Sequence, residues 1–454
     1  MAIWYRRVFL LAIPLILSNL TQPLLSTVDT VLSGHLPGAA ALGGVAVGGI
    51  FFNSVFWTFG FLRMSTTGLV AQAYGARDHL ALRLHFARAL LAAAAIGALL
   101  LAVQGPLIAV SIRLLGAGPE VARNAAAYCQ IRIWSAPAAL ANYVILGSLL
   151  GRQRARTALA IQAAINVVNV CVALVLVLRL HWGVAGIATA TMMADYAGLL
   201  MGLAITVQSK ALSGGRTSDG ARDRIRWAEL MHGPSLRHLF ALNRDLLLRT
   251  LSLVAAYAWF TRSGAREGDA MLAANAVLLN LHSIASYALD GFANATEALV
   301  GAAVGARRLM DYRAVLRAST VAAGVVAGLM SLTYLVLGRE LVGLFTNLEP
   351  VRELAIRYLP WMIAMPSIAV WGFQLDGIFI GATRARDLRD SMVVSFVGYL
   401  GLAIALEHWF GNSGLWCAFL CFMVLRGATL GLRLPGIERS FAEAPQPAVA
   451  WIGS

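Results

Sequence analysis

Charged residues are scarce in this sequence. Of its 454 residues, 13% are Asp, Glu, Lys or Arg and 59% are hydrophobic, whereas an ordinary globular domain is about one-quarter charged and half apolar. A soluble protein of this length could not bury so much apolar surface. The shortage of charge therefore excludes a soluble protein and favours one that is embedded in a membrane.

The motifs of several enzyme classes are missing. Lys210 is the single lysine and follows Gln208-Ser209, so there is no G-x-x-x-x-G-K-[ST] phosphate-binding loop. There is also no H-E-x-x-H, Cys-x-x-Cys or G-x-S-x-G motif, which disfavours a membrane protease or hydrolase. We expect no catalytic residues and no enzyme activity.

Cysteines are few, and none suggests a metal site. All four lie in apolar stretches: Cys129, Cys171, Cys417 and Cys421. The last two are one helical turn apart, with no histidine or further cysteine nearby, and such a pair is a weak metal ligand. We interpret the cysteines as small apolar residues and expect no bound metal and no organic cofactor.

Long uncharged segments are what the sequence does contain. Residues 89–112 and 157–178 carry no charge, and a helix that crosses a membrane needs about 20 apolar residues. Twelve such segments are predicted, at 8–33, 41–74, 84–112, 124–150, 157–178, 184–207, 241–262, 270–304, 316–338, 354–382, 390–409 and 412–434. The predicted fold class is an all-α, polytopic membrane protein with twelve transmembrane helices.

The sequence repeats itself with an offset of 230 residues. Three blocks match without a gap: Ser33-Gly34, Gly38 and Leu42 with Ser263-Gly264, Gly268 and Leu272; Leu69-Val70 and Gly75-Ala76-Arg77 with Leu299-Val300 and Gly305-Ala306-Arg307; Gly147, Gly151 and Arg154-Ala155-Arg156 with Gly377, Gly381 and Arg384-Ala385-Arg386. Six helices per half return the chain to its starting side, so the two halves are parallel repeats, expected to surround a central cavity. We predict an N-terminal bundle at 1–207, a linker at 208–240, a C-terminal bundle at 241–434 and a tail at 435–454.

The distribution of Lys and Arg predicts the orientation. If the N-terminus is cytoplasmic, most of the 36 Lys and Arg fall in inner segments; Arg249 is assigned to an inner segment and Arg132 to an outer one. Both termini and the linker are then cytoplasmic, and the first apolar stretch is an uncleaved helix rather than a signal peptide. The net charge of +14 is explained by topology and implies no nucleic-acid partner.

Ionisable residues inside the predicted spans are the candidates for function. Each costs about 2.5–3.5 kcal/mol on insertion scales at the centre of a bilayer, so such groups line water or pair with one another. The candidates that we select are Asp29, Arg63, Asp195, Asp290, Glu297, Asp376 and Arg426. At the 230 offset no acid meets an acid, since Asp29 corresponds to Trp259 and Asp376 to Leu146. The halves therefore share a scaffold but differ in charge.

Asp29 is four residues before Ser33-Gly34, about one turn inside the outer end of its helix. A carboxylate there reaches external water through a cavity and can carry a proton; alternatively it only hydrates the helix end. Asp195 and Arg63 lie near the middle of their spans, where a buried pair between them would be functional or purely structural.

Asp290 and Glu297 are seven residues apart and share a helix face with His282 and Asn294. These four side chains form a polar stripe, which either faces a cavity or forms hydrogen bonds with neighbouring helices. Asp376 lies about six residues from the inner end of its span, where it anchors a loop or takes part in transport.

Several segments resemble one transporter family. Ile13-Pro14 and Ser26-Thr27-Val28-Asp29-Thr30 resemble the first helix of the multidrug and toxic compound extrusion (MATE) transporters. The stretch from Phe61 to Ala73, Asp290-Gly291-Phe292-Ala293 and the stretch from Asp376 to Arg384 resemble the DNA-damage-inducible-protein-F branch of that family. The resemblance runs to about residue 434.

The resemblance implies a cation-coupled antiporter of the bacterial cytoplasmic membrane that extrudes small hydrophobic, often cationic compounds and acts as a monomer. It further implies that Asp29 is protonated during the cycle, grouped with Asn169 and Thr191. Related members often carry an Asp four residues after that Asn, where this sequence has Ala173. The coupling ion is therefore expected to be a proton, with sodium as the alternative.

Two other functions fit the twelve-helix plan. A lipid-linked oligosaccharide flippase of the same superfamily would need a cationic cavity for pyrophosphate, and the acids within the spans outnumber Arg63 and Arg426. A membrane scaffold or enzyme without a transport cycle would keep its function if every buried acid were replaced.

Overall fold

The computed structural model describes residues 1–36, 38–208 and 226–443, apart from the side chains of 22–26, 207 and 443. Nearly all of these residues are helical, and none of them forms a strand. Within these described ranges, eleven helical segments are long and apolar enough to cross a membrane. The predicted all-α membrane fold is therefore confirmed.

The helices of the N-terminal half are partly interrupted. They are α1 Ala2–Gly34, α2 Ala39–Thr58, α3 Phe61–Gly75, α4 His79–Ala102, α5 Gln104–Leu114, α6 Pro119–Arg132, the 3₁₀ turn Ile133–Ser135, α7 Ala136–Gly151, α8 Ala155–Leu174, the π turn Val175–Arg179 and α9 Gly183–Gln208. Three predicted spans, 41–74, 84–112 and 124–150, are thus each divided in two. Gly60, Pro106 and Pro137 lie at or just after the breaks, where glycine lacks helix propensity and proline lacks an N–H donor.

The helices of the C-terminal half are mostly continuous. They are α10 Trp227–Leu230, α11 Gly233–Arg266, α12 Asp269–Gly305, α13 Leu309–Phe345, α14 Glu349–Gly381, α15 Ala385–Phe410, α16 Asn412–Gly431 and α17 Leu434–Glu443. The predicted span 241–262 is α11, which is long enough to be the twelfth spanning helix but is less apolar because it contains Arg244, Asp245 and Arg249.

The 230-residue repeat recurs in the backbone. Positions 39–75, occupied by α2 and α3, correspond to 269–305, occupied by α12. Arg77 and Arg307 adopt positive φ values of 59° and 54°. After each of them the next amide closes the helix end in the same way, with Asp78 N–H donating to Ala73 O and Arg308 N–H to Ala303 O, which is a Schellman cap. The repeat is therefore structural as well as sequential.

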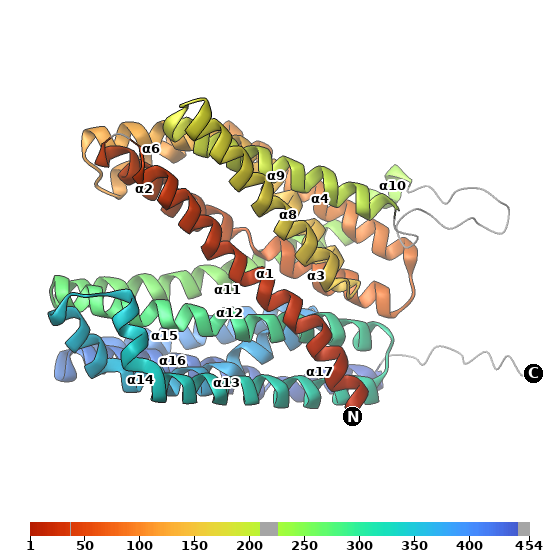
Figure 1. Ribbon diagram of the computed structural model, residues 1–454. Helices are drawn as coiled ribbons and strands as arrows, with labels where there is room; N and C mark the ends of the chain where they lie inside the picture. The colour runs from red at the N-terminus through yellow and green to blue at the C-terminus, as the bar shows by residue number, and fades with distance from the viewer. Residues whose placement is uncertain (37, 209–225, 444–454) are drawn as a thin grey trace, which may run out of the picture.

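The two halves form two layers of helices that meet near the N-terminus and lie further apart at the opposite end (Figure 1). Helix α1 runs diagonally from one layer to the other (Figure 1). Its first part packs on the C-terminal half, where the Phe9 and Phe292 rings meet edge to face at 5.6 Å. Its later part packs on α8. The predicted boundary at residue 207 thus separates the sequence repeats, while α1 contacts both bundles.

Glycines bring the two halves into backbone contact at the end near the N-terminus. A Cβ added at Gly75 would overlap the backbone of Ala302, and one at Gly305 would overlap that of Gln72. The offset of 230 converts one of these contacts into the other, so they obey the pseudo-two-fold symmetry. Gln72 Nε2 also donates to Gly381 O at 2.9 Å. We call this the glycine seam; it is closed in this structure.

The linker and the tail are partly helical. Residues 209–225 of the predicted linker 208–240, including Arg222 and Arg224, lie outside the described residues, and α11 already begins at Gly233. Arg88 of α4 donates to Leu230 O at 3.0 Å, which fixes α10 to the N-terminal half. In the predicted tail 435–454, α17 packs on α13 through an Arg313–Glu438 ion pair of 2.7 Å. Residues 444–454 lie outside the described part of the chain.

Candidate functional site

A cavity of about 670 Å³ lies within the N-terminal half. Its lining residues come from α1, α2, α6, α7, α8 and α9, and Tyr287 of α12 completes it. Ligand pockets typically span about 300–1,000 Å³. Of the predicted site residues, Asp29, Thr191 and Asp195 line this cavity. The sequence predicted a central cavity between the two bundles, whereas the described cavity lies mainly in the N-terminal bundle and only Tyr287 of its lining comes from the other bundle.

Asp29 presents a carboxylate to the cavity from α1. The residue is 8% exposed. Its Oδ1 atom has no hydrogen-bond partner among the described residues. Polar atoms buried in protein are normally hydrogen-bonded, so an unmatched acceptor beside a cavity is available to a proton, a cation or a donor group on a ligand. The predicted role of Asp29 as the protonated acid remains a prediction.

Asn169 and Thr191 form a polar pair between α8 and α9. Asn169 Nδ2 donates to Thr191 Oγ1 at 2.9 Å, and Thr191 donates on to Ile187 O at 3.2 Å. Asn169 Oδ1 is buried without a described partner. Ala173, one turn further along α8, is fully buried. Helices α8 and α9 thus bring amide and hydroxyl groups together beside the cavity, with no second carboxylate at the Ala173 position.

Arg132 is a cavity residue that sequence reasoning assigned to an outer segment. It ends α6 and lines the cavity. Its Nη1 donates to the Tyr128 hydroxyl at 2.5 Å, and its guanidinium lies 4.8 Å from the centre of the Phe52 ring. The sequence could have identified Arg132 as a candidate, because it lies inside the predicted span 124–150. Placing its charge in the membrane costs as much free energy as placing the charge of one of the acids there.

Asp195 and Arg63 are not joined as expected. Asp195 and Arg132 both line the cavity. Arg63 instead donates from Nη1 to Asn294 Oδ1 of α12 at 2.9 Å. Within the described ranges the two residues form no ion pair with each other. Arg63 therefore connects the two halves, and Asp195 belongs to the cavity.

Asp376 is the centre of a buried charge network in the C-terminal half. It accepts hydrogen bonds from Arg249 and, at 2.8 Å, from Arg426. The three side chains are between 3% and 8% exposed. Sequence reasoning assigned Arg249 to an inner segment, but it is buried within α11. We call these residues the Asp376 triad; its acid already holds two cations.

Asp290 and Glu297 lie on α12, outside the cavity lining. Glu297 is 1% exposed, and its Oε1 has no partner among the described residues. Other members of the predicted stripe have partners in neighbouring helices, since His282 Nε2 contacts the Tyr257 hydroxyl at 2.9 Å and Asn294 accepts from Arg63. Neighbouring helices therefore satisfy part of this stripe.

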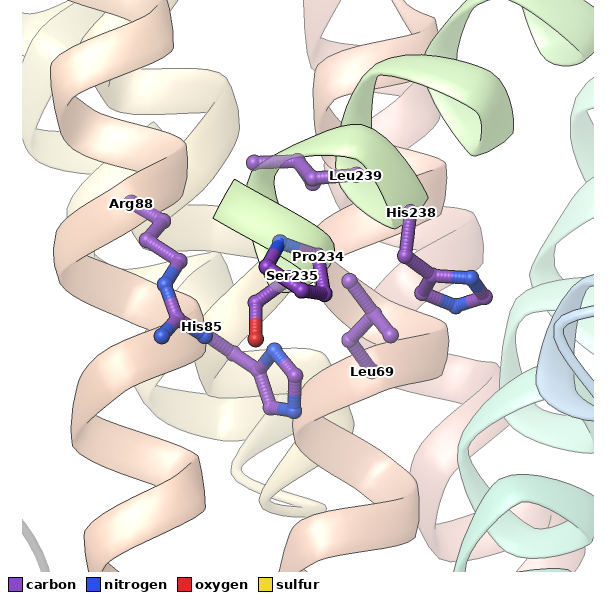
Figure 2. Close-up of a pocket in the computed structure, with 7 residues that line it drawn as sticks. All are labelled: Leu69, His85, Arg88, Pro234, Ser235, His238 and Leu239. Carbon is purple, nitrogen blue, oxygen red and sulfur yellow. The ribbon is translucent and has the colours of Figure 1, made fainter. Parts of the chain in front are cut away.

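A smaller hollow of about 270 Å³ lies between α3, α4 and α11, where the two halves meet. Figure 2 shows His85 and Arg88 of α4 on one side and His238 and Ser235 of α11 on the other. None of its described lining residues is acidic. Because its walls come from both halves, a movement between them would change its shape.

Comparisons with known proteins agree with this architecture. The MatE family model matches residues 14–175 and again 248–409, once in each half. Over 429 residues the chain is 42% identical to DNA damage-inducible protein F of Escherichia coli K12, covering 94% of this chain and 90% of that protein. It is 28% identical over 452 residues to a probable multidrug resistance protein NorM of Bradyrhizobium diazoefficiens, covering 94% and 93%.

Solved structures show the same fold. The structure of a multidrug resistance MATE family transporter in an outward-facing conformation superposes with a TM-score of 0.82 at 18% identity, covering 96% of this chain and 97% of that one. A structure of MATE in a bent conformation gives a TM-score of 0.84, with 96% of each chain covered. On the sequence match in both halves, this multi-pass membrane protein belongs to the MatE family, as a relative of DNA damage-inducible protein F.

Proposed function

We propose that this protein is a proton-coupled antiporter that exports small hydrophobic, often cationic compounds through the N-terminal cavity. The observation that supports this most directly is Asp29, whose Oδ1 is unmatched at the wall of a cavity large enough for a drug-sized molecule. Relatives named as multidrug resistance proteins indicate the substrate class.

Competition for one carboxylate would couple the two fluxes. Asp29 binds a proton or a cationic substrate but not both, and each occupancy would favour a different conformation. With one proton entering for each monovalent cation leaving, no net charge moves. The membrane potential, about 2.3 kcal/mol per charge per 100 mV, would then do no work, and the pH gradient alone would drive export.

The arrangement of the two halves supports alternating access. The glycine seam is closed at the end near the N-terminus, while the layers lie further apart at the opposite end. With both termini cytoplasmic in a bacterial inner membrane, this conformation would be open to the outside. One chain contains both halves, so we propose that a monomer is sufficient, without a cofactor other than the coupling ion.

The choice of ion rests on position 173 of α8, which carries no acid in this chain. Hard cations prefer several oxygen ligands, and the position that often carries a second Asp in relatives is Ala173 here. A proton needs only one carboxylate oxygen. We therefore favour protons over sodium.

A flippase for lipid-linked oligosaccharides is the second candidate, and one observation favours it. Arg132 in the cavity and the buried Arg249 add two cations, so acids no longer clearly outnumber arginines within the spans. The Asp376 triad, however, already pairs Arg249 and Arg426. Among the described lining residues, Arg132 is then the one arginine in the cavity for a pyrophosphate, beside Asp29 and Asp195.

The test is dye transport into proteoliposomes under a pH gradient alone or a sodium gradient alone. We expect the pH gradient to drive a cationic dye and Asp29→Asn to lower the rate at least tenfold. Asp269→Asn, which removes an exposed acid at the start of α12, is the matched control. Transport driven only by sodium would favour the alternative ion. Full-rate transport by a correctly inserted Asp29→Asn variant would remove Asp29 from the mechanism.

A further inference from the structure

The cavity contains a cation that is not paired with a carboxylate. Arg132 donates from Nη1 to Tyr128 Oη and lies over the faces of Phe52 and Tyr128, at 4.8 Å and 5.5 Å from the ring centres. Its Nε is buried without a hydrogen-bond partner, and no carboxylate of the described residues lies within 4.0 Å of its guanidinium. Arg249 and Arg426, which are buried in the C-terminal half, do have such a partner in Asp376.

The same cavity holds two acids, Asp29 and Asp195. With both acids ionised, the three groups sum to one negative charge, which suits a cation. With Asp29 protonated they sum to zero, with a separate negative and positive group on the wall. A binding site that presents both signs is complementary to a ligand that carries both signs.

The surroundings of Arg132 suit a carboxylate. A guanidinium binds carboxylates through two parallel hydrogen bonds, and stacking on aromatic faces holds its plane in a fixed orientation. Phe52, Tyr128 and Tyr143, together with Phe56 and Trp57 on α2, give the same cavity broad apolar walls. An aromatic compound with a carboxylate and a distant cationic group fits these features.

We infer that Arg132 is a specificity-determining residue that receives the carboxylate of amphoteric aromatic substrates, while the acids of the cavity receive their cationic end. This inference rests on the proposed export function. The competing explanation is structural, since a basic residue in the last turn of α6 also favours the helix dipole.

A matched pair of dyes separates these explanations. Rhodamine B is a zwitterion with a free carboxylate, and its ethyl ester is a permanent cation that differs only at that group. Binding to the purified protein is measured by fluorescence anisotropy and transport in proteoliposomes, and the rhodamine B to ester ratio is the readout. A purely structural role for Arg132 would change both dyes together and leave the ratio constant.

We expect Arg132→Gln to lower the rhodamine B to ester ratio at least tenfold. Arg132→Lys keeps the positive charge but cannot form two parallel hydrogen bonds with a carboxylate, so it should lower the ratio less. Arg123→Gln is the control, because its side chain lies on the same helix and is 78% exposed; it should leave the ratio unchanged. If Arg132→Gln does not fold, Tyr128→Phe tests the site by removing the hydroxyl that fixes the guanidinium, with an expected change of about twofold or more.

Two negative results are distinguishable. If the wild-type protein moves neither dye under any gradient, the proposed export function fails. If it moves both and the Arg132 variants change them in parallel, the export function stands and the assignment of Arg132 is wrong.

Discussion

The two halves use the same helical scaffold but fill its centre differently. The N-terminal half contains the cavity, whereas the equivalent region of the C-terminal half is filled with aromatic rings. Thr30, which lines the cavity, corresponds at the 230 offset to Phe260, and Asn169 corresponds to Tyr399. The Phe260 ring packs on Trp416 at 4.7 Å and on Phe419 at 5.1 Å. The two halves keep the same backbone arrangement, so the volume of their side chains decides which half has room for a ligand.

The charges differ between the halves in the same way. In the N-terminal half Asp29 keeps an unmatched oxygen at the cavity, whereas Asp376 in the C-terminal half is held by two arginines. The residue equivalent to Asp376 is Leu146, which lines the cavity. An acid without a cationic partner suits exchange of ligands, and an acid inside a network suits stability. The following experiments test that distinction.

The largest effect on stability is expected from Asp376→Asn. It leaves Arg249 and Arg426 as buried cations without their shared carboxylate, and breaking such a network costs about 3–5 kcal/mol. Asp29→Asn should change stability far less while abolishing transport. Unfolding of the two purified variants under the same detergent conditions checks this. Equal loss of stability would show that Asp29 is also structural.

The next experiment adds an aromatic ring to the cavity of the N-terminal half and removes one from the packed centre of the C-terminal half. Thr30→Phe places in the cavity the ring that Phe260 supplies on the other side, so we expect transport to fall at least tenfold with little loss of stability. Phe260→Ala should instead cost about 3–5 kcal/mol, because it removes a fully buried aromatic side chain. Transport rates and unfolding temperatures for both variants check the pair. A Thr30→Phe protein that exports normally would place the substrate path elsewhere.

The contact between the halves is tested at the glycine seam. The double change Gly75→Ala and Gly305→Ala inserts two methyl groups where the backbones touch. We therefore expect the ratio of closed to open molecules to fall at least several-fold. Distances between spin labels on α3 and α12 measure it. Gly105→Ala on α5, where nothing lies within 4 Å of the added methyl, is the control and should leave the distances unchanged.

The smallest effect is expected at the turn between α11 and α12. Burial, together with the charge of Glu407, raises the pKa of Glu267 above its ordinary value. A group that binds its proton more tightly in the folded state stabilises it at low pH, and this contribution is lost as pH rises through the folded pKa. Glu267→Gln should therefore flatten the fall of stability with rising pH. An unchanged pH profile would contradict this.

Much of the architecture could be predicted because it depends on composition and repetition. Apolar length predicted the spans, and the 230 offset predicted the parallel halves, down to the helix ends at Arg77 and Arg307. The breaks within three spans were missed, although Gly60, Pro106 and Pro137 were visible there. Hydropathy is averaged over many residues, so a single glycine or proline hardly changes it. Backbone hydrogen bonding, in contrast, is interrupted locally at such a residue.

The site was only partly predictable. Asp29 and Asp195 were selected because ionisable groups in apolar spans are costly, and that cost brings them to a cavity. Thr191 was selected only through the family resemblance. Arg132 and Arg249 were assigned to loops because the orientation rule counts arginines near span ends without asking where each side chain lies. That the cavity lies in one half follows from side chains at distant positions, such as Phe260 and Trp416, and required the three-dimensional packing.

Helix α1 touches both halves and also carries the acid of the cavity. Phe9 near its start packs on Phe292 of α12, and Asp29 lies 20 residues further along, among the helices of the other bundle. Any rotation of one bundle against the other must bend α1 or shift it along its axis, and either motion displaces the Asp29 carboxylate. Conversely, a ligand that pulls on the carboxylate transmits force to the opposite bundle, so a single continuous segment serves as the mechanical link between occupancy and shape.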